Sequence, residues 1–274
     1  MNEKKTKIPP LIYGTAWKKE RTAELVEKAI LYGFRGIDTA CQPKHYNELG
    51  VGEALQNLKQ KGIGREALYL QTKFTPLSGQ DPSKIPYDPD SSLKEQVHQS
   101  FTVSLKNLGV EFIDTLLLHS PLPSREQTMT VWKSMEELYN QGVVSNLGLS
   151  KCYGLTDFQF IYNEARVKPS VLQNRFYNET DYDKMMRAWC HEKEIYYQSF
   201  WSLTANPHLL IHPLLRNIAS TRSLTEAQIF FRFLNQMQII PLIGTCSDKH
   251  MQEDLSIFDF TLTAQELDMI HSLL

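Results

Sequence analysis

Three ionisable residues stand at the ends of short apolar segments of the chain. Asp38 lies in GIDTA, Lys73 in LYLQTKF and His119 in DTLLLHS. A charge at the rim of an apolar segment is costly to remove from water unless it is paired. Asp38 and Lys73 can pair with each other if their segments are neighbours. A purely structural ion pair beside a hydrogen-bonded histidine is the alternative, but three successive occurrences favour a catalytic site.

A tyrosine between the first two of these residues supplies an acid. Tyr46 lies in HYNELGVGEAL, just before an expected helix, and a free tyrosine has a pKa of about 10. We expect the Lys73 ammonium to lower the pKa of Tyr46 towards the range useful for general acid catalysis. Asp38 would keep Lys73 charged, and a neutral His119 would position a carbonyl oxygen. This set predicts protonation of a carbonyl oxygen as a cofactor delivers hydride to its carbon.

The elements that position these residues alternate along the chain. Short apolar segments are followed by longer amphipathic stretches, which indicates parallel strands with both sheet faces covered. Eight such units in 274 residues are about 34 residues each, as in a (β/α)8 TIM barrel. A doubly wound open sheet competes, but no G-x-G-x-x-G follows the first segment. We predict one α/β barrel domain over residues 1–274, with strands in 9–17, 34–40, 67–74, 112–120, 143–151, 169–176, 194–201 and 238–245.

Amphipathic periodicity predicts the helices between these strands. Gly33 is a natural stop for the first of them. One connection, 75–92, holds four prolines and cannot be helical through most of its length. Because it follows a strand, it would lie on the barrel face where active sites are built. It is either a functional loop or an ornamental insertion. Helices are expected in 22–33, 49–58, 93–108, 129–139, 180–191 and 224–234.

Composition excludes several classes of function. The chain is 42% apolar and 22% charged, and 29 Lys and Arg against 31 Asp and Glu give a net charge of −2, without the basic excess of a nucleic-acid-binding protein. No apolar run is long enough to span a membrane. Residues 1–10 are polar and basic, unlike a secretory signal. The four scattered cysteines predict neither a metal site nor disulfides, and indicate a reduced, cytoplasmic setting. Cys41 and Cys246 are expected to be buried fillers. The oligomeric state is left open.

The ordered set GIDTA, HYNELGVGEAL, LYLQTKF, DTLLLHSP, GLSK, VLQNRF and LIGTCSDKHMQED resembles the aldo-keto reductase family over almost the whole chain. The resemblance implies a (β/α)8 barrel that uses NADPH, less often NADH, to reduce aldehydes and ketones. It also implies the catalytic set Asp38, Tyr46, Lys73 and His119. Members usually read D-T-A-x-x-Y-x-N-E, whereas the loop here is longer. Counting back from Asn47-Glu48 would place His45 at the tyrosine position, so His45 is the alternative donor.

The resemblance also implies cofactor contacts. Ser150 and Gln173 match residues that hold the nicotinamide carboxamide, while Lys151 and Leu172 replace expected asparagines. Gln198 stands at the usual aromatic shelf, for which Phe200 or Trp201 could substitute. At the adenosine phosphate site, Gly244 replaces a lysine and His250 an arginine, which weakens the set of fixed cations. NADPH is the first expectation and NADH remains open. The implied cofactor residues are Thr15, Ala16, Ser150, Gln173, Gln198, Phe200, Thr245, His250, Glu253 and Asp254.

The substrate end is less defined. Trp17 resembles a pocket aromatic, His119 would contact the substrate carbonyl, and Thr75 stands where many relatives have tryptophan. The family's long C-terminal substrate loop is not recognisable after TLTAQELDMIHSLL. A shorter lid makes fewer specificity contacts, which predicts a broad range of aldehydes or dicarbonyls. The 75–92 loop would act as the substitute lid.

Two other functions are considered. Lys73 at a strand end could form a Schiff base in an aldolase, although a neighbouring Asp38 would raise the pKa of the lysine and oppose that chemistry. Alternatively, the altered cofactor contacts would suit a nicotinamide-nucleotide-binding barrel that acts as a sensor or subunit with little turnover.

Overall fold

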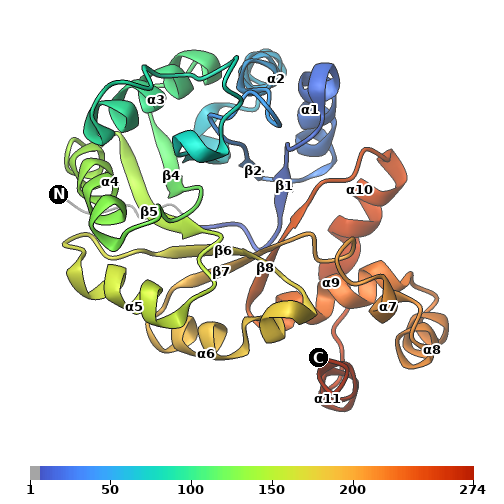
Figure 1. Cartoon of the computed structure of the whole chain (residues 1–274). Helices are drawn as coiled ribbons and strands as arrows, with labels where there is room; N and C mark the ends of the chain where they lie inside the picture. The colour runs from blue at the N-terminus through green and yellow to red at the C-terminus, as the bar shows by residue number, and fades with distance from the viewer. Residues whose placement is uncertain (1–6) are drawn as a thin grey trace.

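A closed barrel of eight parallel strands forms the centre of the computed structural model, which describes residues 7–274 (Figure 1). The strands follow one another around the barrel in chain order, and β8 pairs with β1. Every strand lies inside one of the eight apolar segments, so the predicted (β/α)8 architecture is confirmed. The strands are β1 (Ile12–Gly14), β2 (Gly36–Asp38), β3 (Tyr69–Phe74), β4 (Ile113–Leu118), β5 (Val144–Ser150), β6 (Val171–Arg175), β7 (Tyr196–Phe200) and β8 (Ile239–Ile243).

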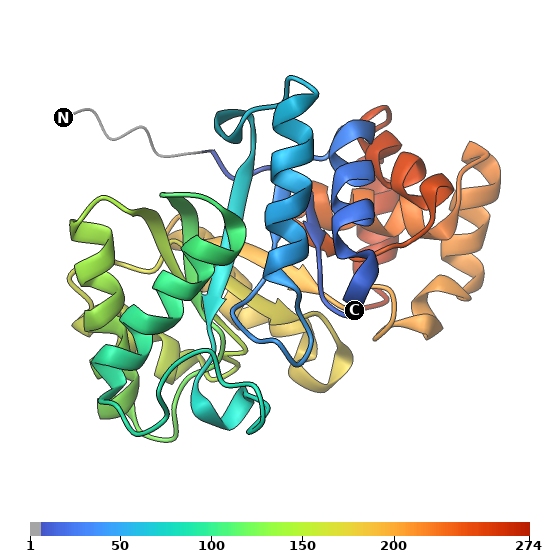
Figure 2. The same cartoon turned by 90° about the horizontal axis from the view of Figure 1, so that it is seen from above.

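Helices surround the barrel, and the last units close the ring beside the first, where α10 packs next to α1 (Figures 1 and 2). The first helix ends where predicted, because Gly33 takes a φ of 134° and donates its N–H to the last carbonyls. The helices are α1 (Thr22–Tyr32), α2 (Glu48–Gln60), α3 (Leu93–Leu108), α4 (Arg125–Asn140), α5 (Leu155–Glu164), α6 (Lys184–Glu192), α7 (Pro207–Leu210), α8 (Pro213–Arg222), α9 (Glu226–Gln236), α10 (Asp248–Leu255) and α11 (Ala264–His271).

The helix expected over 180–191 begins only at Lys184. The preceding 3-10 segment, Asn178–Asp183, holds three consecutive left-handed residues from Asp181 to Asp183. Tertiary contacts impose this turn, since the Tyr182 ring packs 5.1 Å from that of Phe176. The Asp183 carboxylate also accepts hydrogen bonds from buried groups on β6 and β7. Local periodicity could not predict contacts of this kind.

The inside of the barrel is filled in two layers of different character. A small apolar cluster includes Ile12, Tyr69, Leu117, Val171 and Ile240. Beside it lies a polar layer of three buried glutamines, Gln71, Gln173 and Gln198, whose amides hydrogen-bond to one another. The main hydrophobic core lies between the strands and the surrounding helices. The polar layer therefore supports the carboxyl ends of the strands from within the barrel.

The 75–92 loop is held down against the barrel. Its Tyr87 hydroxyl donates to the Thr75 carbonyl at 2.8 Å, and the Gln80 amide donates to the carbonyls of Cys41 and Thr75. Both Gln80 and Tyr87 are buried. No residue from 76 to 92 lines the main cavity described below. In this structure the loop supports the site from behind, and the expectation that it forms a lid is wrong.

Further expectations concern the chain ends and the cysteines. Residues 1–6, part of the segment interpreted as unlike a secretory signal, lie outside the described residues. Across positions 7–274, no helix combines the length and apolar character needed to cross a bilayer. Cys41 is buried, as expected, but Cys246 is exposed because it sits in the loop after β8. The interpretation of Cys246 as a buried filler was wrong.

Candidate active site

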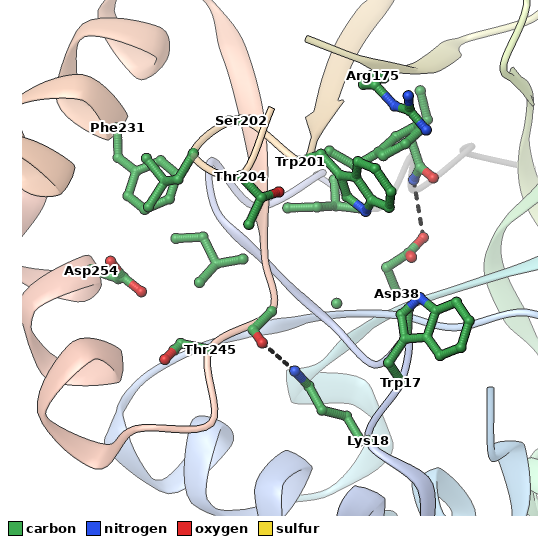
Figure 3. Close-up of a pocket in the computed structure, with 18 of the residues that line it drawn as sticks. Trp17, Lys18, Asp38, Arg175, Trp201, Ser202, Thr204, Phe231, Thr245 and Asp254 are labelled. Atoms are coloured by element: carbon green, nitrogen blue, oxygen red, sulfur yellow. Dashed lines mark hydrogen bonds between the residues drawn. The ribbon is translucent and has the colours of Figure 1, made fainter. Parts of the chain in front are cut away.

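A cavity of about 780 Å³ opens at the carboxyl ends of the strands (Figure 3). It runs from Trp17 and Asp38 at one end to Phe231 and Asp254 at the other. Its volume falls within the range of small-molecule and cofactor sites. Because strand ends and their following loops carry the active site in this architecture, the cavity is the candidate active site.

Asp38 and Lys73 form the ion pair predicted from their strand positions. The Lys73 ammonium lies 2.7 Å from Asp38 Oδ1 and 2.6 Å from Oδ2, and it donates to the Thr39 carbonyl at 2.9 Å. These contacts use its three N–H groups, and the Lys73 side chain is completely buried. Burial lowers the pKa of Lys73, while the charge of Asp38 acts in the opposite direction. Lys73 does not line the cavity, which argues against a Schiff-base role.

The amide layer inside the barrel holds Asp38 in place. The Asp38 carboxylate accepts from Gln71 Nε2 at 2.6 Å and from Gln173 Nε2 at 3.0 Å. Gln198 accepts from both glutamines at 2.9 Å and donates back to Gln71. Gln198 is thus committed to the barrel interior and does not reach the cavity. The structure corrects its expected place at the cofactor shelf.

Tyr46 lies against both Lys73 and His119. Its ring centroid is 5.2 Å from the Lys73 ammonium and 5.9 Å from the His119 ring, in an edge-on arrangement. Within residues 7–274 the Tyr46 hydroxyl has no hydrogen-bond partner, and the side chain lines the cavity. Burial raises the pKa of Tyr46, and the charge of Asp38 raises it further. The expected lowering by Lys73 is therefore wrong for this structure, because burial, and after it the charge of Asp38, both raise the pKa of Tyr46.

His45 faces a different neighbour. Its ring packs against Trp17 at a tilt of 41° with centroids 3.9 Å apart, and its Nδ1 is 2.9 Å from Gln42 Oε1. Burial lowers the pKa of His45. Trp17 is 60% exposed and adopts a left-handed φ of 64°, which is unusual for a bulky residue. The structure brings Tyr46, rather than His45, against Lys73 and His119, while Trp17 and His45 both line the cavity.

His119 is buried and held from behind. Its Nδ1 lies 2.7 Å from the Thr75 hydroxyl at the end of β3. Burial lowers the pKa of His119 well below its usual range, and the charge of Lys73 adds to the effect. The imidazole is therefore neutral, as expected. It lines the cavity, so the ring edge not engaged by Thr75 can meet a ligand.

The next strand ends offer contacts for a planar amide. Ser150 Oγ is buried, lines the cavity and has no hydrogen-bond partner among the described residues. Gln173, Phe200 and Ala16 also line the cavity. Thr15 does not, because its hydroxyl donates to the Asp38 carbonyl at 2.9 Å inside the structure. The structure thus removes Thr15 from the set of cavity residues.

The far end of the cavity is formed by the β8 loop and α10. Thr245, His250, Glu253 and Asp254 line it. Asp254 is buried and has no hydrogen bond to another described group, and burial raises its pKa to about 7. A buried carboxyl without a partner is costly unless a ligand satisfies it.

Sequence reasoning missed a cation beside this end. Lys18 lies in the loop after β1, and its ammonium contacts the Gly244 carbonyl in the loop after the neighbouring strand β8 (Figure 3). The ammonium also lies 3.4 Å from Cys246 Sγ. A Cβ at position 244 would lie 3.5 Å from the Lys18 ammonium, an ordinary van der Waals distance. The only sequence signal was the position of Lys18 directly after Trp17. Arg175, Phe231 and the 201–204 segment also line the cavity and were not assigned to it, apart from Trp201.

These residues fit a nicotinamide dinucleotide. The cavity runs from Trp17 and Asp38 at one end to the Asp254 carboxyl at the other (Figure 3). The unpartnered Ser150 hydroxyl lines it at the end of β5, next to β4, the strand that precedes His119. A neutral imidazole and a tyrosine side chain line the same cavity. The fold and the site therefore define a barrel oxidoreductase.

Comparison with known proteins gives the family. The family model described as "Aldo/keto reductase family" matches residues 10–274. The chain belongs to the aldo/keto reductase family.

Individual relatives are similar over most of their length. A glyoxal reductase of Bacillus subtilis is 26% identical over 91% of this chain and 82% of its own. An NADPH-dependent alpha-keto amide reductase of Saccharomyces cerevisiae is 28% identical over 97% of this chain and 88% of its own. The crystal structure of an aldo/keto reductase from Brucella melitensis superposes with a TM-score of 0.81 at 29% identity, covering 97% of this chain and 95% of that one.

Proposed function

We propose that the protein is an NADPH-dependent aldo-keto reductase that reduces aldehydes and ketones to alcohols, with Tyr46 as the proton donor. The observation that carries the proposal is the contact of Tyr46 with both Lys73 and His119 beside the cavity. Its free hydroxyl is available to a substrate oxygen. The closed barrel supports the expectation of a single domain over the described residues 7–274.

Each residue has a proposed part in the reaction. With the Thr75 hydroxyl donating to Nδ1, the neutral His119 carries its proton on Nε2 and donates it in a hydrogen bond to the carbonyl oxygen. Tyr46 is protonated before the reaction because its pKa is raised, and it gives its proton to the same oxygen. The nearby Lys73 ammonium stabilises the phenolate that is left, and Asp38 keeps the ammonium in position. The cofactor supplies hydride to the carbonyl carbon when bound.

Residues of the cavity would hold the nucleotide. Ser150 and Gln173 would bind the carboxamide, Phe200 and Trp201 would cover the ring, and Ala16 would lie beside it. The adenosine end would use Thr245, His250, Glu253 and Asp254. The position of Lys18 favours NADPH over NADH, because its ammonium places a positive charge beside the loop in which Gly244 replaces the expected lysine. NADH is the alternative, since Lys249 is paired with Glu253 at 3.5 Å and is less free to bind a phosphate.

The proposed substrates are small aldehydes and dicarbonyls. This follows the printed names of the relatives, which include a glyoxal reductase and an alpha-keto amide reductase. It also agrees with the partly open cavity mouth, where Trp17 and Trp201 are exposed aromatic surfaces.

Oxidation of NADPH and of NADH, followed by absorbance with a panel of aldehydes and ketones, tests the proposal. Tyr46→Phe should lower turnover by about 10²- to 10⁴-fold, because it removes only the proton and keeps the ring. Nucleotide affinity, measured by calorimetry, should change little. His45→Asn is the matched control. If His45→Asn abolishes turnover while Tyr46→Phe retains it, the assignment of the donor is wrong.

One observation keeps a second function in view. All three N–H groups of Lys73 are used by Asp38 and Thr39, so none is directed to the Tyr46 hydroxyl. A nucleotide-binding barrel with little turnover would show this arrangement too. Tight nucleotide binding without turnover of any carbonyl in the panel would favour that function.

A further inference from the structure

Two cations line the cavity without a carboxylate to neutralise them. Lys151 directly follows β5, and Arg175 ends β6, the next strand around the barrel. Over the described range 7–274, neither side chain has an Asp or Glu oxygen within 4.0 Å. Lys151 is exposed and Arg175 is half-buried, so both can meet an anion that enters the cavity. The absence of a protein partner leaves both available to a ligand.

Arg175 is held in place by aromatic rings. Its guanidinium lies 4.2 Å from the Trp201 ring centroid and 5.0 Å from that of Tyr177 (Figure 3). The buried Nε has no hydrogen-bond partner in the described part of the chain. Aromatic faces position a guanidinium but do not neutralise it. The planar fork of donors is therefore preorganised for an anion.

Lys151 carries its charge close to the reacting groups. It adopts a left-handed φ of 54°, and its backbone N–H donates to the Gln173 carbonyl at 3.0 Å. Partial burial lowers the pKa of Lys151, and the charges of Lys73 and Arg175 lower it further. The charge of Lys151 in turn contributes to the lowered pKa values of His45 and His119. The charge of Lys151 therefore acts on Arg175, His45 and His119 within the same part of the cavity.

The neighbouring carboxylates are committed elsewhere. Asp38 accepts from Lys73 and two glutamines, as described above. Asp157 pairs with Arg125 at 2.7 Å, and Asp183 accepts from Asn174 and Tyr197. The charges of Asp38 and Lys73 cancel each other. Lys151 and Arg175 therefore give this end of the cavity an excess positive charge. Such an environment selects a negatively charged ligand.

We infer that Lys151 and Arg175 bind the carboxylate of the substrate, so that the enzyme prefers aldehydes or ketones that carry a carboxylate. This inference rests on the proposed reductase function and specifies its substrate class. The phosphates of the nucleotide are a second source of negative charge. Lys18, on the opposite side of the cavity from Arg175, is better placed for them because it contacts the Gly244 loop (Figure 3).

Turnover of a matched pair of substrates tests the inference. 4-Carboxybenzaldehyde and its methyl ester share a reacting group and differ in charge. We expect the wild-type kcat/KM to favour the acid, and the acid-to-ester ratio to fall about tenfold in Lys151→Met and in Arg175→Met, equivalent to about 1.4 kcal/mol. The preference should also weaken as salt is raised from about 0.05 to 0.5 M. The ratio cancels any general loss of activity.

Conservative and distant variants serve as controls. Lys151→Arg should keep most of the preference, and Arg175→Lys, which retains the charge without the planar fork, should keep more of it than Arg175→Met. Retention in these variants would exclude misfolding as the cause of its loss. Lys133→Met removes the same charge from the exposed face of α4 and should leave the ratio unchanged. Equal kcat/KM for acid and ester in the wild-type protein, or a ratio unaffected in both Met variants, would overturn the inference while leaving the reductase function intact.

Binding without turnover separates the two claims. Calorimetry with benzoate and benzamide, which cannot be reduced, should show tighter binding of benzoate that both Met variants weaken. If no aldehyde is reduced but this pattern holds, the reductase function fails and the anion site stands. If the wild-type protein does not distinguish benzoate from benzamide, the anion site is wrong. A loss of NADPH affinity as large as the loss of benzoate affinity would assign both cations to the cofactor instead, and would also overturn it.

Discussion

The buried pair of Asp38 and Lys73 should behave as one energetic unit. The Asp38 carboxylate accepts hydrogen bonds from Lys73, Gln71 and Gln173. Asp38→Asn would replace one acceptor oxygen with an NH₂ group, which would face the N–H donors of the surrounding side chains. Lys73→Met would leave the carboxylate buried with two amide donors and no cation. Removing one partner of a buried pair costs about 3–5 kcal/mol, which is a large part of a typical stability of about 5–15 kcal/mol.

The double variant Asp38→Asn/Lys73→Met should cost less than the sum of the single losses, by about 2 kcal/mol or more, because it leaves no uncompensated charge. Urea unfolding of the wild-type protein, the two single variants and the double variant measures the coupling energy between the two side chains, provided that the slope of the unfolding free energy with urea is the same in all four. Lys133→Met, on the outer face of α4, is an additive control when combined with Asp38→Asn. Losses that simply add would show that the two side chains do not stabilise each other.

The pH dependence of the single variant gives an independent check. Burial already lowers the pKa of Lys73, and Asp38 opposes this shift. Without Asp38, the pKa of Lys73 should fall further below its unfolded value of about 10.4. Between the two values the unfolded chain binds the extra proton, so stability increases with pH. The loss of unfolding free energy in Asp38→Asn relative to the wild-type protein should therefore become smaller from pH 7 towards pH 10. A loss that stays constant over that range would refute the reasoning.

Two further predictions concern the ends of the cavity. Because burial raises the pKa of Asp254 from 3.8 to about 7, Asp254→Asn should increase the free energy of unfolding by at most about 4 kcal/mol above pH 7. This gain in stability should grow from pH 4 to about pH 7, because in that range the native wild-type protein holds a proton that the unfolded chain has lost. Urea unfolding at pH 4.5 and pH 8 measures the gain. Equal gains at the two pH values would contradict the prediction. Ser150→Ala should weaken nucleotide binding about 3- to 10-fold in calorimetry, because it removes a ligand hydrogen bond. Its thermal stability should be equal or slightly higher, since the Ser150 hydroxyl has no partner among the described residues.

The strands and the central ion pair could be predicted because both depend on local pattern. Eight apolar segments were each long enough for one strand, and parallel neighbours bring consecutive strand ends together. Asp38 and Lys73 therefore had to lie side by side, and they do. The predicted first helix also ended at Gly33. These features need no knowledge of side chains from distant parts of the chain.

The features that were missed depend on contacts between distant segments. Lys18 reaches Gly244 across 226 positions, and no local pattern announces such a contact. The sequence places Gln198 in a strand, but it does not show how deep inside the barrel its side chain lies. The raised pKa of Tyr46 depends on its burial and on the nearby charge of Asp38. Each of these properties is set by three-dimensional depth rather than by residue type.

The polar layer inside the barrel links the stability of the fold to the position of the site. Gln71 and Gln198 do not line the cavity, yet together with Gln173 they hold the Asp38 carboxylate through a continuous set of hydrogen bonds. An apolar interior would pack at lower desolvation cost but would leave Asp38 with Lys73 as its only side-chain partner. The amides satisfy the remaining acceptor capacity of the carboxylate and restrict its rotation. The position of the Lys73 ammonium beneath Tyr46 therefore depends, through Asp38, on Gln71 and Gln198, two residues that do not line the cavity.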